Sequence, residues 1–165
     1  MAELFEMKNA GAIGFGDYKK SIANPNMLKL ALLYSKDFNL PVFSFPLNKE
    51  ISNNGVMNES KTSTMLGLKG IPNISEEIQI MRDIRILEYT GGNLHIPYIS
   101  TGNSLELIKK AKDKGLNISC STCIHNLFFI HWFFFVWFSF FIGRSMTKKL
   151  SCWSKFTKFM TNHVF

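Results

Sequence analysis

The sequence predicts an α/β protein in which helices cover a parallel β-sheet. Short apolar segments typical of strands alternate with longer segments whose apolar residues recur at helical spacing, in the order β-α-β-α-β-α-β. The connections are long enough for crossover helices, and the strands are mostly apolar, as in parallel sheets. From these patterns alone, an open doubly wound sheet and a piece of an eight-stranded barrel are equally acceptable.

The first strand is expected at residues 10–15, AGAIGF, which are small, apolar and bounded by glycine. A helix follows within residues 23–39, because Asn24 is a favoured N-cap residue and Pro25 suits the first helical position. The apolar residues of this helix are spaced to form one buried face. They are Met27, Leu28, Ala31, Leu32 and Tyr34.

The second strand is expected at residues 40–45, LPVFSF, and ends before a proline. Residues 46–73 are polar and contain glycine, which predicts a long functional or covering loop. Ser75 is the expected cap of a second helix, which Gly91 ends. The predicted buried face of that helix consists of Ile74, Ile78, Met81, Ile84 and Leu87.

The last two elements of the pattern follow directly. Residues 94–100, LHIPYIS, predict a third strand, and residues 101–115 predict a third helix with Gly115 at its end. Residues 116–123, LNISCSTC, predict a fourth strand.

The overall composition is that of one ordinary domain, with 165 residues of which 46% are hydrophobic. The net charge of +7 arises late in the chain, since residues 1–126 hold 14 basic and 12 acidic residues. This balance and the absence of interleaved arginine and aromatic residues argue against nucleic-acid binding. The opening MAELFEMKNAG lacks the pattern of a signal peptide, so we expect a cytoplasmic protein.

The cysteines offer little support for a metal site. Cys120 and Cys123 form a C-x2-C pair with His125 two residues further on, but a structural zinc site needs four ligands. The remaining cysteine and the other two histidines after His95 lie beyond residue 130. We therefore expect Cys120 and Cys123 to be small apolar strand residues.

A specific family resemblance appears in residues 55–96, GVMNESKTSTMLGLKGIPNISEEIQIMRDIRILEYTGGNLHI. This segment resembles the central part of dihydroorotases, amidohydrolase-superfamily enzymes of pyrimidine biosynthesis, which carry G-V-x-N-E-G, L-G-L-x-G-I-P, E-E-I, A-R-D and T-G-G-x-x-H-I. The likeness extends over residues 1–129, so the predicted domain is a partial (β/α)8 barrel of about four β/α units. The resemblance implies a cyclic-amide hydrolase that interconverts dihydroorotate and N-carbamoyl-aspartate with hydroxide generated on zinc.

The zinc-ligand positions of that family carry other side chains in this chain. The second aspartate of F-x-D-D is Tyr18, although the first is kept as Asp17; the histidine of H-C-E-D is Phe45, and the second histidine of H-I-x-H is Tyr98. Phenylalanine has no lone pair, and tyrosine with its usual pKa near 10 is a poor ligand. We expect no bound zinc and no catalytic residue, with the retained His95 an ordinary strand histidine.

The resemblance also implies that other parts of the family's site fall before Met1 or after Phe129. These are the H-x-H pair, the substrate-binding arginine and the late-strand catalytic aspartate. The chain is therefore predicted to be a truncated, catalytically inactive pseudoenzyme. The enzyme hypothesis is that it is by descent a dihydroorotase. The alternatives are a structural partner of aspartate carbamoyltransferase and a gene remnant; open strand edges further predict self-association.

The resemblance ends abruptly at residues 130–165, which are rich in phenylalanine and tryptophan. Residues 127–165 hold 11 of the 16 phenylalanines, all three tryptophans, five basic residues and no acidic residue. Residues 127–142 form an apolar run that is shorter than the roughly 20 residues of a membrane span. We favour a frameshift product over a membrane segment, because a barrel that turns into a membrane span in mid-strand has little precedent.

Overall fold

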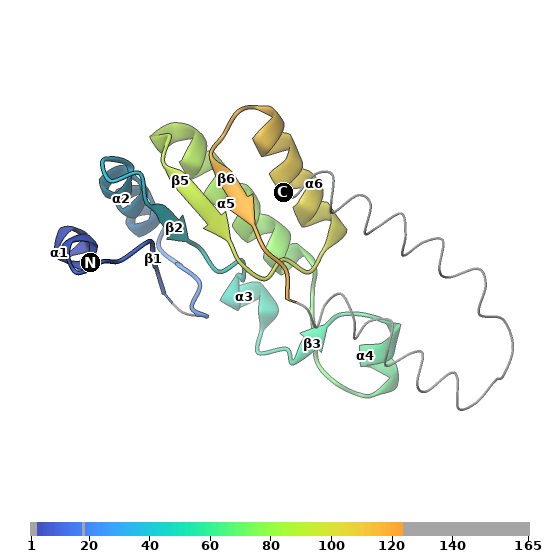
Figure 1. Ribbon diagram of the computed structural model, residues 1–165. Coiled ribbons are helices and arrows are strands. Elements are labelled where there is room, and N and C mark those ends of the chain that lie inside the picture. The colour runs from blue at the N-terminus through green and yellow to red at the C-terminus, as the bar shows by residue number, and fades with distance from the viewer. Residues whose placement is uncertain (1–2, 18, 124–165) are drawn as a thin grey trace, which may run out of the picture. The chain divides into compact units, whose positions relative to one another are not determined.

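The computed structural model describes residues 3–17 and 19–123. Their centre is a four-stranded sheet in the order β1-β2-β5-β6, in which every neighbouring pair is parallel (Figure 1). The strands are β1 (Phe15–Gly16), β2 (Pro41–Phe43), β5 (Asn93–Ile96) and β6 (Ile118–Cys120). The predicted α/β architecture of four parallel strands with crossover helices is confirmed.

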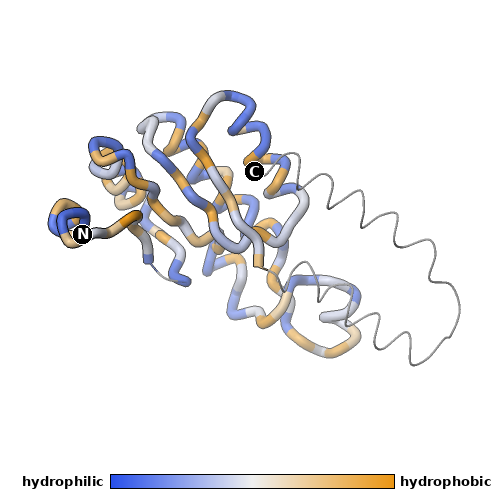
Figure 2. Tube along the Cα trace, in the orientation of Figure 1, coloured by the Kyte–Doolittle hydropathy of each residue, from blue (hydrophilic) through white to orange (hydrophobic). Residues whose placement is uncertain are grey.

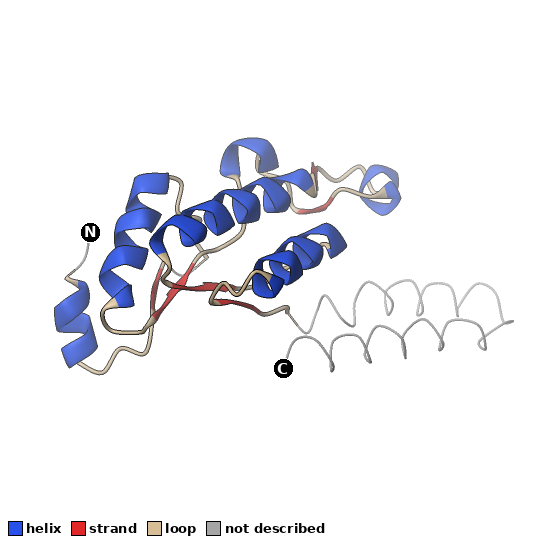
Figure 3. Ribbon diagram, turned by 90° about the horizontal axis from the view of Figure 1, so that it is seen from above, coloured by secondary structure: helices blue, strands red, loops and turns tan. Residues whose placement is uncertain are grey.

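Three long helices cover one face of this sheet, as the view in Figure 3 shows. They are α2 (Pro25–Lys36), α5 (Ile74–Thr90) and α6 (Gly102–Asp113). The core lies between these helices and the strand residues that point toward them, namely Val42, Leu94, Ile96 and Ile118, each at most 5% exposed. The opposite face of the sheet is not covered by these helices.

The start of α2 agrees with its sequence. The Asn24 side chain accepts a hydrogen bond from the Asn26 backbone N–H at 2.9 Å, and Pro25 occupies the first helical position. Leu28 and Leu32 are fully buried, whereas Met27 and Tyr34 are exposed. The predicted face was too wide, because only the narrow i, i+4 stripe of α2 meets the sheet.

The beginning of the chain differs from the predicted strand over residues 10–15. A short helix, α1 (Leu4–Asn9), comes first, and Gly11 adopts a positive φ of +97° in the turn that follows. Ile13 is exposed, and the ladder with β2 begins only at Phe15. The prediction was wrong here because small apolar residues serve a turn as well as a strand.

The buried face of α5 also differs from the predicted one. Ile74, Ile78 and Met81 are exposed, although Ile84 and Leu87 are buried as expected. The helix instead buries several polar side chains: Ser75, Glu76, Gln79, Asp83 and Thr90. Each of these polar side chains has a hydrogen-bond partner, which is what permits a polar residue to be buried.

The ends of the last two helices follow their predicted signals more closely. At α5, Asn73 rather than Ser75 precedes the first helical residue, and Gly91 ends the helix with φ of +64°. At α6, the Thr101 hydroxyl accepts a hydrogen bond from the Ser104 backbone N–H at 3.2 Å. Gly115 follows that helix with φ of +80°.

The predicted loop over residues 46–73 is in fact a small structured insert. It contains α3 (Lys49–Ser52), β3 (Met57–Asn58), α4 (Lys61–Met65) and β4 (Gly70–Ile71), with β3 and β4 paired in parallel. Figure 2 shows apolar residues on the outer loop beside α4, where Met65, Leu66 and Leu68 are exposed. The insert leaves the sheet at the carboxyl end of β2, the edge where the predicted ligand positions lie.

Among the described residues, none of the helices has both the length and the apolar character needed to cross a membrane. The apolar run at residues 127–142 and the predicted domain boundary between residues 129 and 130 lie outside the described residues. Both stay predictions.

Candidate functional site

The candidate site lies at the carboxyl edge of the sheet. Asp17 follows β1 directly, Phe45 comes two residues after β2, and Tyr98 comes two residues after β5. Because carboxyl ends of parallel strands share one edge, these positions converge. The Phe45 and Tyr98 rings lie 6.1 Å apart between centroids, with their planes inclined by 60°. Tyr18 lies outside the described residues.

The chemistry offered by this ring pair is apolar. Phe45 is half-buried, and Tyr98 is 41% exposed. Tyr98 holds a left-handed backbone conformation with φ of +61°, which costs a residue with a side chain about 1 kcal/mol. The turn after β5 therefore carries local backbone strain beside the aromatic ring pair.

His95 lies on β5, three residues before Tyr98, and its side chain is on the face of the sheet that the helices leave uncovered. Its Nδ1 is 2.8 Å from the Ser119 hydroxyl oxygen, and its Nε2 is 3.2 Å from the Ser121 hydroxyl oxygen. The Phe43 ring packs against it edge-on at 5.0 Å between centroids. Both ring nitrogens are thus engaged by neighbouring hydroxyls, as expected for a strand histidine that serves the structure.

We expect His95 to make the stability of the chain sensitive to mild acid. Burial lowers the pKa of His95, so the folded state prefers the neutral ring. The contribution of the neutral His95 ring to the free energy of unfolding is fully present above the pKa of the unfolded state, near 6.5. It is lost as the pH falls through the lower pKa of His95 in the folded state. Urea unfolding at pH 7.5 and pH 5 should show a larger loss for the wild type than for His95→Gln. An equal loss in the two proteins would contradict this expectation.

Glu76 fastens the turn that follows Tyr98. Its carboxylate accepts hydrogen bonds from the backbone N–H groups of Ser100, at 3.1 Å, and Thr101, at 3.2 Å. The Ser100 hydroxyl donates to the same carboxylate at 2.6 Å, and the Thr101 hydroxyl donates at 3.2 Å. This buried side chain therefore connects the start of α5 to the β5–α6 turn at the carboxyl edge of the sheet.

The described donors do not fit zinc. Phe45 supplies no donor atom, Tyr98 supplies a phenol, and both nitrogens of His95 are engaged by serine hydroxyls. Within residues 3–17 and 19–123, no group of three or more His, Cys, Asp or Glu side chains is arranged to hold a metal ion. Cys120 and Cys123 are half-buried, and burial raises the pKa of the Cys120 thiol, which disfavours the thiolate that zinc requires.

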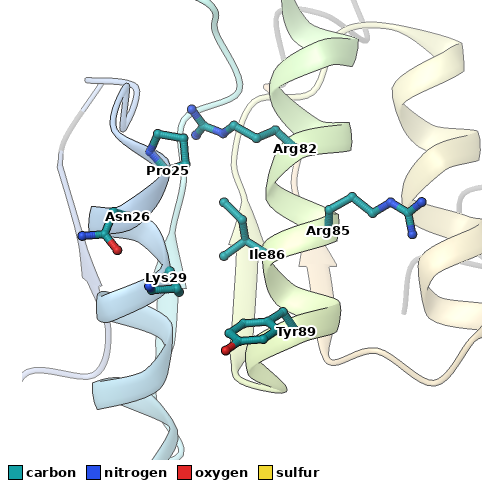
Figure 4. A pocket seen from close by; sticks show the side chains of 7 residues that line it. All are labelled: Pro25, Asn26, Lys29, Arg82, Arg85, Ile86 and Tyr89. Carbon is teal, nitrogen blue, oxygen red and sulfur yellow. The ribbon is translucent and has the colours of Figure 1, made fainter.

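A groove of about 590 Å³ lies elsewhere, between α2 and α5 (Figure 4). Pro25, Ile86 and Tyr89 contribute apolar walls. The Arg82 guanidinium binds the Asp83 carboxylate at 2.7 Å and donates to the Ile22 and Ala23 carbonyls. Arg85, which pairs with Glu88, points away from the groove in Figure 4. The Arg82 guanidinium is thus engaged by other groups of the protein, whereas Arg85 forms an exposed pair within α5.

Several residues of this region were not singled out by the sequence. Ser119 lies on β6 and Ser121 follows that strand directly, so the face that they share with His95 could have been inferred once the β5–β6 register was known. Glu76 lies in the acidic first turn of α5, and nothing in its spacing predicts bonds to residues 24 and 25 positions later.

Four parallel strands joined by crossover helices have the architecture of a segment of a (β/α)8 barrel. Solved structures of similar fold include the L-hydantoinase (dihydropyrimidinase) of Arthrobacter aurescens, with a TM-score of 0.59 at 19% identity over 73% of this chain and 29% of that chain. The D-hydantoinase (dihydropyrimidinase) of a Thermus species gives 0.59 at 20% identity, over 75% of this chain and 29% of that chain. At such low identity these structures bear on the fold alone.

The family follows from the sequence comparisons. The model of the dihydro-orotase-like family matches residues 1–104, and the chain therefore belongs to this family. A dihydroorotase of Endomicrobium trichonymphae is 46% identical over 125 residues, which are 76% of this chain and 30% of the relative. A dihydroorotase of Acetivibrio thermocellus is 42% identical over 125 residues, 76% of this chain and 29% of the relative. The chain thus spans about 30% of the length of these relatives.

Proposed function

We propose that this chain is a dihydroorotase-like protein that binds no catalytic zinc and does not hydrolyse dihydroorotate by itself. The observation that carries the proposal is the Phe45–Tyr98 ring pair, 6.1 Å apart, at two positions where the resembled family carries zinc-binding histidines. A hydrolase of this class needs a metal-bound hydroxide, and an aromatic pair leaves the metal without ligands there.

The neighbouring polar groups do not replace the lost ligands. Asp17 is exposed after β1, and a single carboxylate holds zinc weakly. To bind zinc, His95 would have to give up its contacts with Ser119 and Ser121. Burial lowers the pKa of His95 and so favours its neutral ring, but one imidazole supplies only one ligand. The proposal therefore does not depend on Tyr18, which the structure does not describe.

The test is hydrolysis of dihydroorotate by the purified chain, with and without added zinc, followed through release of N-carbamoyl-aspartate. A full-length dihydroorotase at the same concentration is the positive control. We expect no turnover above the uncatalysed rate under either condition. Zinc-dependent turnover that a chelator abolishes would overturn the proposal.

The other roles stay predictions from the resemblance. Aspartate carbamoyltransferase as a partner would be detected by co-sedimentation of the two purified proteins, and a gene remnant would show no stable expression. Residues 127–142 as a membrane segment would be detected by fractionation.

A further inference from the structure

The four-stranded sheet has two free edges among the described residues. The strand order β1-β2-β5-β6 leaves β1 and β6 with one strand neighbour each. A free edge presents backbone N–H and C=O groups that a further strand can pair. Since all three existing pairings are parallel, a further parallel strand would continue the same kind of ladder.

The direction of the hydrogen bonds identifies the groups at the β6 edge. The Leu94 N–H donates to the Asn117 carbonyl at 2.9 Å, and the Ser121 N–H donates to the Ile96 carbonyl at 3.1 Å. Successive residues of a strand direct their N–H and C=O groups to opposite sides, so Asn117 and Ser121 face β5. The Cys120 N–H therefore points to the free side of β6.

The uncovered face of the sheet carries large side chains at its centre and small ones at its edges. Gly16, Phe43, His95 and Ser119 are in register across the four strands and share this face. The two large side chains lie on the central strands, and the two small ones lie on the edge strands. A seam between β6 of one copy and β1 of another would thus bring a serine beside a glycine, which leaves space for the rings of Phe43 and His95.

We propose that two copies of this chain associate through their sheet edges, β6 of each copy pairing in parallel with β1 of the other, to close a barrel of eight strands to which the described residues of each copy contribute four. A twofold axis along the strands keeps all eight strands parallel and pairs both free edges of both copies at once. The uncovered faces then become the barrel interior, where small and large residues alternate, and the helices stay outside. None of the four registered side chains is acidic, lysine or arginine, so the two interior faces bring no such charges together.

The first test is sedimentation velocity of the full 165-residue chain over a wide concentration range, with paired variants at the β6 edge. Cys120→Pro removes the outward N–H but spares the bonds to β5, and Cys120→Ser removes the thiol while keeping that N–H. We expect a discrete dimer for the wild type and for Cys120→Ser, and at least tenfold weaker dimerisation for Cys120→Pro. A wild-type monomer at all concentrations, open-ended oligomers, or equal dimerisation of the two variants would overturn the proposal.

A second measurement keeps the proposal testable if the proline variant does not fold. Hydrogen exchange of the wild type on dilution below the dimer's dissociation constant should expose the amides of β1 and β6 together, while those of β2 and β5 stay protected. Protection of β6 that does not change with concentration would mean that another part of the same chain covers its edge, and the second copy would be excluded as its partner.

Discussion

Replacing Glu76 by alanine should lower the free energy of unfolding by about 3 kcal/mol, because it leaves buried donors without an acceptor. The Ser100 and Thr101 backbone N–H groups both donate to this carboxylate, which is only 8% exposed as a residue. Urea unfolding followed by circular dichroism measures the effect.

Glu77 is the matched control for that variant. It is the adjacent acidic residue in the first turn of α5, but its described contact is one hydrogen bond from the Asn103 side chain at 3.0 Å, in an exposed setting. Glu77→Ala should cost less than about 1 kcal/mol. Similar losses for the two variants would show that charge at the helix N-terminus, rather than the bonds to the β5–α6 turn, is what Glu76 contributes.

Replacing Arg82 by methionine is expected to have a comparably large effect, about 3 kcal/mol, since it removes the partner of a buried carboxylate. Asp83 is 1% exposed and binds the Arg82 guanidinium at 2.7 Å and the Ser44 hydroxyl at 2.6 Å. The same guanidinium also donates to the Ile22 carbonyl at 2.7 Å, so the loop before α2 loses an anchor as well. Arg85→Met is the control, because the exposed Arg85–Glu88 pair contributes well under about 1 kcal/mol.

The cost of the Arg82→Met substitution should depend on pH. Burial already raises the pKa of Asp83, so this carboxyl favours folding below its unfolded pKa near 3.8, and that contribution is lost as the pH rises. Removal of Arg82 raises the pKa of Asp83 further, since the guanidinium is one of the groups that lower it. The stability difference from wild type should therefore shrink as the pH is lowered from 7 toward 4. A difference that is constant over this range would contradict the role assigned to Asp83.

The fold was predictable from the sequence where a local signal coincides with the tertiary structure. Asn24 and Pro25 begin a helix by their own chemistry, and Gly91 and Gly115 end helices because glycine readily takes a positive φ. The alternation of strands and helices predicted the parallel sheet, since crossover helices place each strand in the same direction.

The wrong predictions of helix burial have a common physical cause, which is that burial is decided by partners far along the chain. The apolar spacing of α5 predicted that Ile74, Ile78 and Met81 would be buried, but polar contacts of Glu76 and Asp83 turn another side of the helix inward. The two-residue strands of the insert are too short to show any periodicity.

The candidate site shows the same division between local and long-range information. The resemblance to dihydroorotases predicted Phe45 and Tyr98 at family ligand positions, and the structure brings their rings to 6.1 Å at the carboxyl edge of the parallel strands. The contacts of His95 with Ser119 and Ser121 join residues 24 and 26 positions apart, and depend on a strand register that no local pattern predicts.

Zinc content is the measurement that tests the account most directly. The full chain is incubated with zinc, dialysed against metal-free buffer and measured for metal per chain, beside the double variant Phe45→His/Tyr98→His, which restores imidazole donors at the ring pair. We predict that the wild type retains no zinc and that the double variant retains more. One zinc retained per wild-type chain, and released by a chelator, would contradict the account.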